Sequence, residues 1–329
     1  MGWRGVVRAI EADARRNARA RERNKKIEAK MRLLNDAVDT VNAFESYVEE
    51  LKAIHTTRTS SIVHWNDVVN EPAPNEPTRR ADNELKAKTK LDNFKPSFLD
   101  KLFGLTDKKC QKIKASVGAA IVQDEAIFQV EKKNYQEILT AWHKKRGLAH
   151  RVLIKDAKSY IDALQELHPF ENIQRIGSEI KFSVDEMANL TATLKVCSED
   201  VVPNEKYTLR QSGTLSSKEM PKAEFYSLYQ DYVCSCILRI AAEIFAILPV
   251  EKVLINANDD LLNSSNGHVE EQTICSVLVM RKTFEGLNLS QIDTSDSLKL
   301  FLHRMQFKKS SGFLPVKAVD FEELTVGTA

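Results

Sequence analysis

The chain has 329 residues, which is enough for two structural units. Its 48 Lys and Arg residues nearly balance its 46 Asp and Glu residues, and the formal net charge of +2 excludes a uniformly basic nucleic-acid coat and an acidic tail protein. Charged residues make up 29% of the chain and aromatic residues only 7%, with 11 Gly and 9 Pro, so the composition favours a helix-rich protein and excludes collagen-like, mucin-like and wholly disordered chains.

The N-terminal segment predicts one long helix. Residues 3 to 55 contain no Pro and, after Gly5, no Gly, so nothing in their backbone interrupts a helix. Apolar side chains recur there at steps of three and four residues, with one irregular step, which is the pattern of a coiled-coil seam. The seam consists of Ile27, Met31, Leu34, Val38, Val41, Phe44, Val48, Leu51 and His55.

A second long amphipathic helix is expected over residues 107 to 145. One face of this helix carries Ile113, Val117, Ile121, Phe128, Tyr135, Ile138 and Trp142. Three prolines within residues 72 to 77 predict an extended polyproline-type connector, with short helices expected at 61 to 69 and at 84 to 94. Each long helix alone would leave an apolar stripe in water, so the simplest arrangement is an antiparallel hairpin of the two.

The hydrophobic period changes after a helix expected over residues 149 to 167. Apolar residues alternate with polar ones over 180 to 184 and over 190 to 196, and the polar residues between them are typical of a turn. This pattern predicts a β-hairpin with one buried face. Residues 206 to 209 are expected to form another strand.

A long central helix is expected to begin at Pro221 and to end at Leu248, because this stretch is apolar over most of its circumference. Residues 251 to 258 and 271 to 280 are rich in Val, Ile and Leu, which predicts two strands joined by a polar loop from Asp259 to Glu270. A final helix, capped by Thr294 or Ser295, is expected to run through Met305.

The expected order of elements in the second half is β-β-α-β-β-α. The fold class is therefore α+β, with a long N-terminal antiparallel helical hairpin (coiled coil) followed by a compact domain in which an antiparallel sheet packs on a long central helix. We expect the hairpin arm over residues 1–146, with its Pro-rich connector near 70–80, the α+β domain over 147–320, and a flexible tail over 321–329.

The strongest local charge lies at the N-terminus. Residues 1 to 32 carry eight Arg and three Lys against four acids, a local net charge of +7. One stripe of the expected helix consists of Arg8, Arg15, Arg19, Arg23, Lys26 and Lys30. Such a stripe can follow the phosphates of a nucleic acid with salt-sensitive affinity, although it lacks the aromatic and amide side chains that read bases. A solvated coiled-coil face, or a surface that meets an acidic partner helix, is the favoured interpretation of such a stripe.

A membrane anchor at the N-terminus is disfavoured. Its only bulky apolar residues would be Trp3, Val6, Val7 and Ile10, which are too few for an amphipathic anchor. We therefore expect no membrane partner.

The polar loop expected between the last two strands holds side chains that bind hard divalent cations. They are Asn256, Asn258, Asp259, Asp260, Glu270 and Glu271. A restriction-type nuclease would require an acid followed by Glu-x-Lys on the next strand, and residues 272 to 279 contain no such triplet. An Asp at the start of a polar turn is also what a plain hairpin requires. A metal-dependent hydrolase using Asp259, Asp260, Glu270 and Glu271 is therefore a minor alternative.

Other catalytic signatures are missing from the sequence. The seven His residues show no zinc-ligand spacing, and neither a Gly-rich phosphate loop nor a Gly-x-Ser-x-Gly elbow occurs. We expect no catalytic residue and no cofactor, and we interpret Arg239 and Glu243, four residues apart on the central helix, as a structural ion pair. Five Cys without a repeated framework, no secretory signal and no apolar span predict a soluble cytoplasmic protein with reduced thiols.

Four short segments are distinctive: Met1 to Gly5, Phe225 to Cys236, Asn266 to His268, and His303 to Lys309. Together they resemble an uncharacterised family of bacterial proteins with a coiled-coil arm and an α+β domain. The resemblance spans most of the chain, implies a bacterial origin and transfers no activity and no site. Some coiled-coil accessory proteins of this kind belong to antiviral defence assemblies, which is the setting that the resemblance implies.

Three functional hypotheses follow from the sequence. The first is a non-enzymatic interaction or scaffold subunit that assembles through its helical arm with itself or with partner proteins. The second is a nucleic-acid-binding protein that uses the basic N-terminal stripe. The third is a metal-dependent hydrolase that uses the acidic loop.

Overall fold

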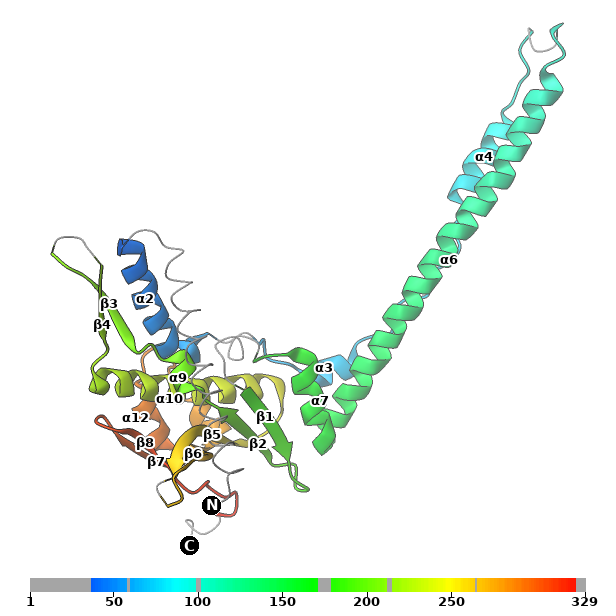
Figure 1. The fold of residues 1–329 in the computed structure, drawn as a ribbon. Coiled ribbons are helices and arrows are strands. Elements are labelled where there is room, and N and C mark those ends of the chain that lie inside the picture. The colour runs from blue at the N-terminus through cyan, green and yellow to red at the C-terminus, as the bar shows by residue number, and fades with distance from the viewer. Residues whose placement is uncertain are drawn as a thin grey trace, which may run out of the picture. The chain divides into compact units, whose positions relative to one another are not determined.

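The computed structural model describes residues 37–57, 60–98, 102–170, 179–211, 215–263 and 265–323. Their contacts define two compact units (Figure 1). The helical unit comprises residues 64–151, and the sheet unit comprises the described residues of 1–63 and 152–329. Helices and strands are mixed, which confirms the α+β class. The division differs from the expected one, in which residues 1–146 formed a single arm.

The sheet unit contains a six-stranded sheet. Its members are β1 (Glu179–Val184), β2 (Leu190–Lys195), β5 (Lys252–Asn263), β6 (His268–Met280), β7 (Leu302–Lys308) and β8 (Gly312–Leu314), in the order β1-β2-β5-β6-β7-β8. The predicted β1–β2 hairpin is confirmed. The sheet is not purely antiparallel, because β2 and β5 are parallel. The chain between these two strands includes a long helix, which is the usual way of joining a parallel pair.

The β5–β6 hairpin is longer than the sequence predicts. Its register runs from Lys252↔Met280 to Asn263↔His268, with a bulge after Ala257. Most residues of the expected loop from Asp259 to Glu270 are therefore paired strand residues. The polar side chains concealed this, because they lie on a part of the ladder that is largely exposed and needs no apolar alternation.

Helix α10 (Lys222–Ile247) is the central helix, as predicted. Pro221 precedes its first turn, where the missing N–H of Pro has no intrahelical partner to lose. Nearly every side chain from Leu228 to Leu248 is buried, because α10 contacts β5 and β8 on one side and helical segments on others. A helix that is apolar all round is stable only in such an enclosed position.

Helix α2 (Ala37–Lys52) and the 3-10 helix η1 (Ile54–Thr56) pack on α10 and on a small hairpin of β3 (Glu205–Leu209) and β4 (Leu215–Glu219). The Phe44 and Tyr207 rings lie 5.7 Å apart, and the Tyr47 hydroxyl donates to the Val201 carbonyl at 2.8 Å. Val41, Phe44 and Leu51 of the apolar seam of α2 are thus buried inside the sheet unit, whereas Val38 is exposed. The expected hairpin between residues 3–55 and 107–145 is not confirmed, since α10 and β3 supply this cover. Residues 3–36 of the expected helix lie outside the described residues.

The ion pair predicted on the central helix is present and buried. Arg239 Nη2 lies 2.7 Å from Glu243 Oε1. Arg239 Nη1 donates to Thr57 Oγ1 at 3.0 Å, and Glu243 Oε2 accepts from the Ser60 N–H at 3.0 Å. The pair therefore also fixes the chain that follows η1 against α10.

The expected final helix is wrong beyond residue 300. Only α12 (Thr294–Ser297) and η2 (Leu298–Leu300) are helical, and α12 is capped by the Asp293 side chain, not by Thr294 or Ser295. The following residues form β7, in which Met305 pairs with Cys275 of β6. Pairing with a buried strand overrides the local helical pattern at this point.

The C-terminal segment covers part of the other face of the sheet. Val319 and Phe321 pack on Leu254 and Leu278, and the Val319 N–H donates to Ser276 Oγ at 2.9 Å. Phe321, expected in a flexible tail, therefore belongs to a small apolar cluster. Residues 324–329 of that tail lie outside the described residues. The remaining helices of the sheet unit are α7 (Ala157–Leu167), α9 (Ser198–Val201) and α11 (Arg281–Glu285).

The helical unit consists of α3 (Trp65–Asn70), α4 (Asp82–Asp92) and most of α6 (Thr106–Leu153). At 1.5 Å per residue α6 is about 70 Å long. It continues through Gly147, which lies between the helices expected over residues 107 to 145 and 149 to 167, because one Gly costs a helix only about 1 kcal/mol. None of the helices formed by the described residues is long and apolar enough to cross a bilayer.

Two different segments accompany α6. The first is α4. Its first turn is joined to α6 by a hydrogen bond from the Glu84 N–H to the Asp124 carboxylate at 2.8 Å. The second is the predicted connector, which is extended over residues 71–81. Two ion pairs join it to α6: Arg79 with Glu125 at 3.2 Å, and Glu71 with Lys145 at 2.8 Å. Buried or half-buried positions of α6 form one seam with steps of three and four residues. They include Ile113, Val117, Ala120, Asp124, Phe128, Glu131, Tyr135, Leu139 and Trp142, whereas Ile121 and Ile138 of the predicted face are exposed.

Candidate functional site

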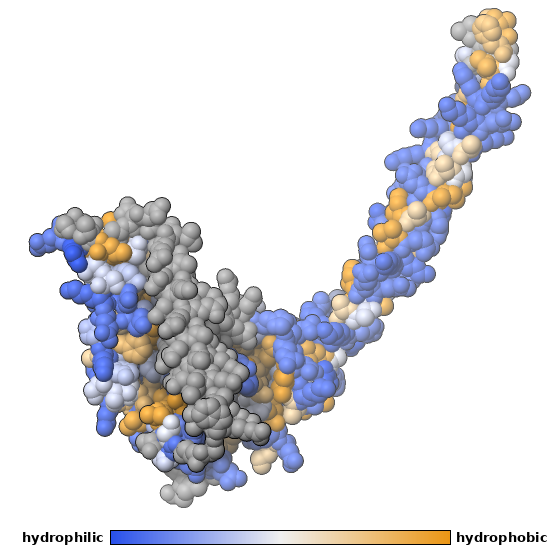
Figure 2. Space-filling model, viewed as in Figure 1, coloured by the Kyte–Doolittle hydropathy of each residue, from blue (hydrophilic) through white to orange (hydrophobic). Residues whose placement is uncertain are grey.

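The first candidate site is the end of the helical unit at which the chain passes from α4 to α6. We call Phe98, Leu102, Phe103 and Leu105 the tip. Phe98 is 80% exposed and Phe103 is 68% exposed, and the two Leu side chains are exposed as well. Figure 2 shows apolar surface gathered at this end of the helical unit. Four large apolar side chains within eight residues form a concentration that exposed surfaces rarely carry without a binding role.

Local backbone chemistry explains why the tip protrudes. Pro96 cannot continue a helix from α4, and Gly104 adopts φ 64 in the left-handed region that favours Gly. Only residues 93–105 lie between the end of α4 at Asp92 and the start of α6 at Thr106. So few residues cannot enclose their own apolar side chains.

The surroundings of the tip are basic. Between residues 90 and 112, the described charged residues are five Lys and two Asp: Lys90, Asp92, Lys95, Asp107, Lys108, Lys109 and Lys112. An apolar centre with a cationic rim matches a partner surface that has an apolar groove and an acidic rim.

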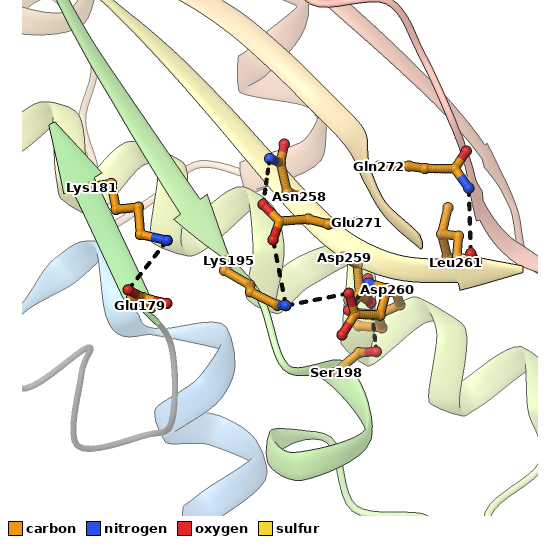
Figure 3. Close-up of polar contacts among 11 residues, drawn as sticks. Glu179, Lys181, Lys195, Ser198, Asn258, Asp259, Asp260, Leu261, Glu271 and Gln272 are labelled. Carbon is orange, nitrogen blue, oxygen red and sulfur yellow. Dashed lines mark hydrogen bonds and ion pairs between the residues drawn. The ribbon is translucent and has the colours of Figure 1, made fainter. Parts of the chain in front are cut away.

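The second candidate site is a polar cluster on β2, β5 and β6 (Figure 3). Lys195 lies at the end of β2, with its Nζ 3.3 Å from Asp260 Oδ1 and 3.4 Å from Glu271 Oε2. Asn258 Nδ2 donates to Glu271 Oε1 at 3.0 Å. Asp260 and Glu271 face each other across the β5–β6 ladder, and the parallel pairing of β2 with β5 brings Lys195 beside them.

The electrostatics of this cluster favour a structural role. Burial alone would lower the pKa of Lys195, but the hydrogen bond with Asp260 and the charges of Asp260 and Glu271 raise it. The hydrogen bond from Asn258 chiefly lowers the pKa of Glu271. A catalytic Lys needs a lowered pKa to act as a base or a nucleophile. Lys195 instead forms ion pairs with two carboxylates, which favour its charged form.

The four acids of the predicted loop do not converge on one point. Asp260 and Glu271 share Lys195, whereas Glu270 accepts hydrogen bonds from Asn263 at 2.9 Å and from Asn266 at 2.7 Å. These two hydrogen bonds lower the pKa of Glu270. Of the two Asn residues grouped with the acids, Asn258 joins Glu271, and Asn256 accepts from Ser276 Oγ at 2.6 Å.

Asp259 lies in a separate buried environment. Its carboxylate accepts from Ser198 Oγ at 2.7 Å, from the Tyr229 hydroxyl, and from the Asp260 N–H at 2.9 Å. Burial raises the pKa of Asp259 in spite of these hydrogen bonds, and burial also raises the pKa of Tyr229 well above its usual value. Across the described ranges, no group of three or more His, Cys, Asp or Glu side chains is placed to hold a metal ion.

Sequence reasoning missed two of these features. Lys195 is 65 residues from Asp260, so a search for Glu-x-Lys on one strand cannot find it. The tip left a signal, because Pro96 and Gly104 enclose a short run of Phe and Leu, but only the structure shows that these side chains stay exposed. The predicted nucleic-acid stripe of Arg8, Arg15, Arg19, Arg23, Lys26 and Lys30 lies outside the described residues.

Comparisons of this chain with protein-family models, with curated proteins and with solved structures find no match.

Proposed function

We propose that this chain is a non-enzymatic interaction subunit that assembles through its helical unit, with partner proteins or with a second copy of itself. The observation that carries the proposal is the exposure of the tip. Phe98, Leu102, Phe103 and Leu105 present two aromatic and two aliphatic side chains in one place. Burying each of them against a partner contributes about 1.5–3 kcal/mol, and aromatic side chains are prominent among the residues that dominate binding energy.

The polar chemistry of the chain supports the same proposal. The cluster around Lys195 pairs its charges internally, and Asp259 is enclosed by hydrogen bonds. The described lysines around the tip are exposed on the helical unit. Such charges speed the encounter with an acidic partner and select against basic ones.

The proposed setting is a bacterial antiviral defence complex in the cytoplasm. This part of the proposal is supported by the family resemblance of the four sequence segments. A scaffold subunit in such a complex needs a stable body and an exposed contact region. The sheet unit and the helical unit suit these two requirements.

The proposal is tested by co-purification from the native host. The wild-type chain should retain partner proteins, and the amount retained by a Phe98→Ser/Phe103→Ser variant should be lower by about tenfold or more. Each lost side chain costs the binding free energy at least about 1–2 kcal/mol. A matched control is the Met187→Ser/Leu300→Ser variant, which removes two equally exposed apolar side chains from the sheet unit. Equal retention by the tip variant and the wild type would overturn the proposal.

A further inference from the structure

A second apolar stripe runs along α6 beside the extended connector. It consists of the apolar residues Ile127, Val130, Ile138 and Ala141, with the polar residue Asn134 at its centre. Val130 is 61% exposed and Ile138 is 57% exposed. The stripe lies about 90° around the helix from the seam that α4 and the connector cover, at 3.6 residues per turn. An extended chain is narrower than a helix, so this stretch of α6 keeps apolar surface that a companion helix would have reached.

The spacing of the stripe is symmetric about Asn134. Its steps are three, four, four and three residues. The first three steps make an eleven-residue pattern, and such spacing keeps the side chains on one face of a nearly straight helix. Read backwards, the pattern is unchanged. A two-fold axis at Asn134 would therefore place Val130 opposite Ile138, and Ile127 opposite the small side chain of Ala141.

We propose that this stripe binds the same stripe of a second copy of the chain, antiparallel and about a two-fold axis at Asn134. The inference rests on the proposed function and names one of its partners. In a two-fold contact each residue must be compatible with its counterpart, which a palindromic stripe satisfies and an arbitrary one does not. Two Asn134 side chains would meet on the axis, where a paired polar residue fixes register at some cost in stability.

Charges beside the stripe fit the same geometry. Lys133 and Glu137 are exposed on one flank of the stripe. With the axis at Asn134, Lys133 of one copy faces Glu137 of the other, and the contact occurs twice. Side chains on a helix lean toward its N-terminus, and in antiparallel helices this lean brings Lys133 toward the opposite Glu137 and moves the two Lys133 side chains apart.

The size of the stripe determines the strength of the contact. Five positions over four turns bury much less than the roughly 800 Å² per partner of a standard stable interface. The dimer is therefore weak and depends on concentration. It leaves the tip, at the other end of α4, available for a different partner.

The test is sedimentation velocity of the full-length chain from about 1 to about 500 µM, a range that covers weak association. Wild type should shift from monomer to dimer. Lys133→Glu and Glu137→Lys should each weaken the dimer about tenfold, because each creates two like-charge contacts, and the Lys133→Glu/Glu137→Lys swap should restore it to within about threefold. Val130→Asp should abolish the dimer. Val122→Asp is the matched control, because Val122 is 69% exposed on another face of α6.

The outcomes separate this inference from the proposed function. A monomer at every concentration, or a dimer that Val130→Asp leaves intact, would overturn the inference. Disruption without rescue by the charge swap would overturn the antiparallel register. In each of these cases, loss of partner proteins from the tip variant would still support the proposed function. A dimer that Val130→Asp disrupts, found together with a tip variant that keeps its partners, would support the inference and overturn the role of the tip.

Discussion

At the scale of single residues, His55 connects three segments of the sheet unit. It lies in η1, where its Nδ1 is 2.8 Å from Ser235 Oγ of α10 and its Nε2 is 2.9 Å from the Leu289 carbonyl oxygen. A carbonyl oxygen only accepts, so Nε2 carries a proton. Burial is the main reason that the pKa of His55 lies below its usual value. The folded protein therefore favours the neutral ring.

This shift predicts a pH dependence of stability. The unfolded chain takes up a proton at His55 as pH falls through about 6.5, whereas the folded chain takes it up only at lower pH. The contribution of neutral His55 to the free energy of unfolding is therefore complete above that pH and is lost as pH falls through the lowered pKa of the folded state. Urea unfolding at pH 7, 6 and 5 should show a smaller decrease in the free energy of unfolding for His55→Gln than for wild type. An equal decrease in the two proteins would show that another group is responsible.

At the scale of elements, α4 depends on a carboxylate from another helix for its N-terminal cap. Ala81 occupies its N-cap position and offers no capping side chain. The carboxylate of Asp124, on α6, takes the place of a capping side chain. It accepts hydrogen bonds from the Glu84 N–H at 2.8 Å and from Asn83 Nδ2 at 2.6 Å. The Glu84 N–H is the main cause of the lowered pKa of Asp124, so this support is present at neutral pH and is lost as pH falls through the lowered pKa.

We expect Asp124→Ala to loosen α4 selectively. The amides of residues 82–92 should exchange with deuterium faster than in wild type, because the unpaired N–H groups of the first turn would weaken the pairing of α4 with α6. Glu125→Ala is the matched control on the same helix, since its ion pair with Arg79 is exposed and contributes little. Unchanged exchange over α4 in the Asp124 variant would contradict the assigned cap.

Elements with a strong local pattern could be predicted from the sequence, and elements that depend on distant pairing could not. The apolar circumference of α10 and the alternation of β1 and β2 each specify one element type without a partner. Strand β7 reads locally as helix and becomes a strand only because β6 pairs with it. The pattern of α2 demanded a cover but did not specify it, since α10 and β3 satisfy an apolar seam as well as a second long helix does.

At the scale of the whole molecule, the two units differ in how they use their side chains. In the sheet unit, the central helix and its ion pair are buried, and Asp260 and Glu271 of the polar cluster share the charge of Lys195. In the helical unit, a long helix with a narrow companion keeps apolar side chains at the surface, at the tip and along the stripe. The candidate site was therefore only partly predictable, because the sequence identifies apolar residues but not which of them remain uncovered.

The central claim, that assembly occurs through the helical unit, is tested most directly by amine-specific cross-linking of the full-length chain in its native host. Mass spectrometry should locate intermolecular cross-links mainly on lysines of the helical unit, with Lys108, Lys109 and Lys112 linked to partner proteins and Lys133 linked to a second copy. Intermolecular cross-links confined to lysines of the sheet unit, with residues 64–151 linked only within their own chain, would contradict the claim.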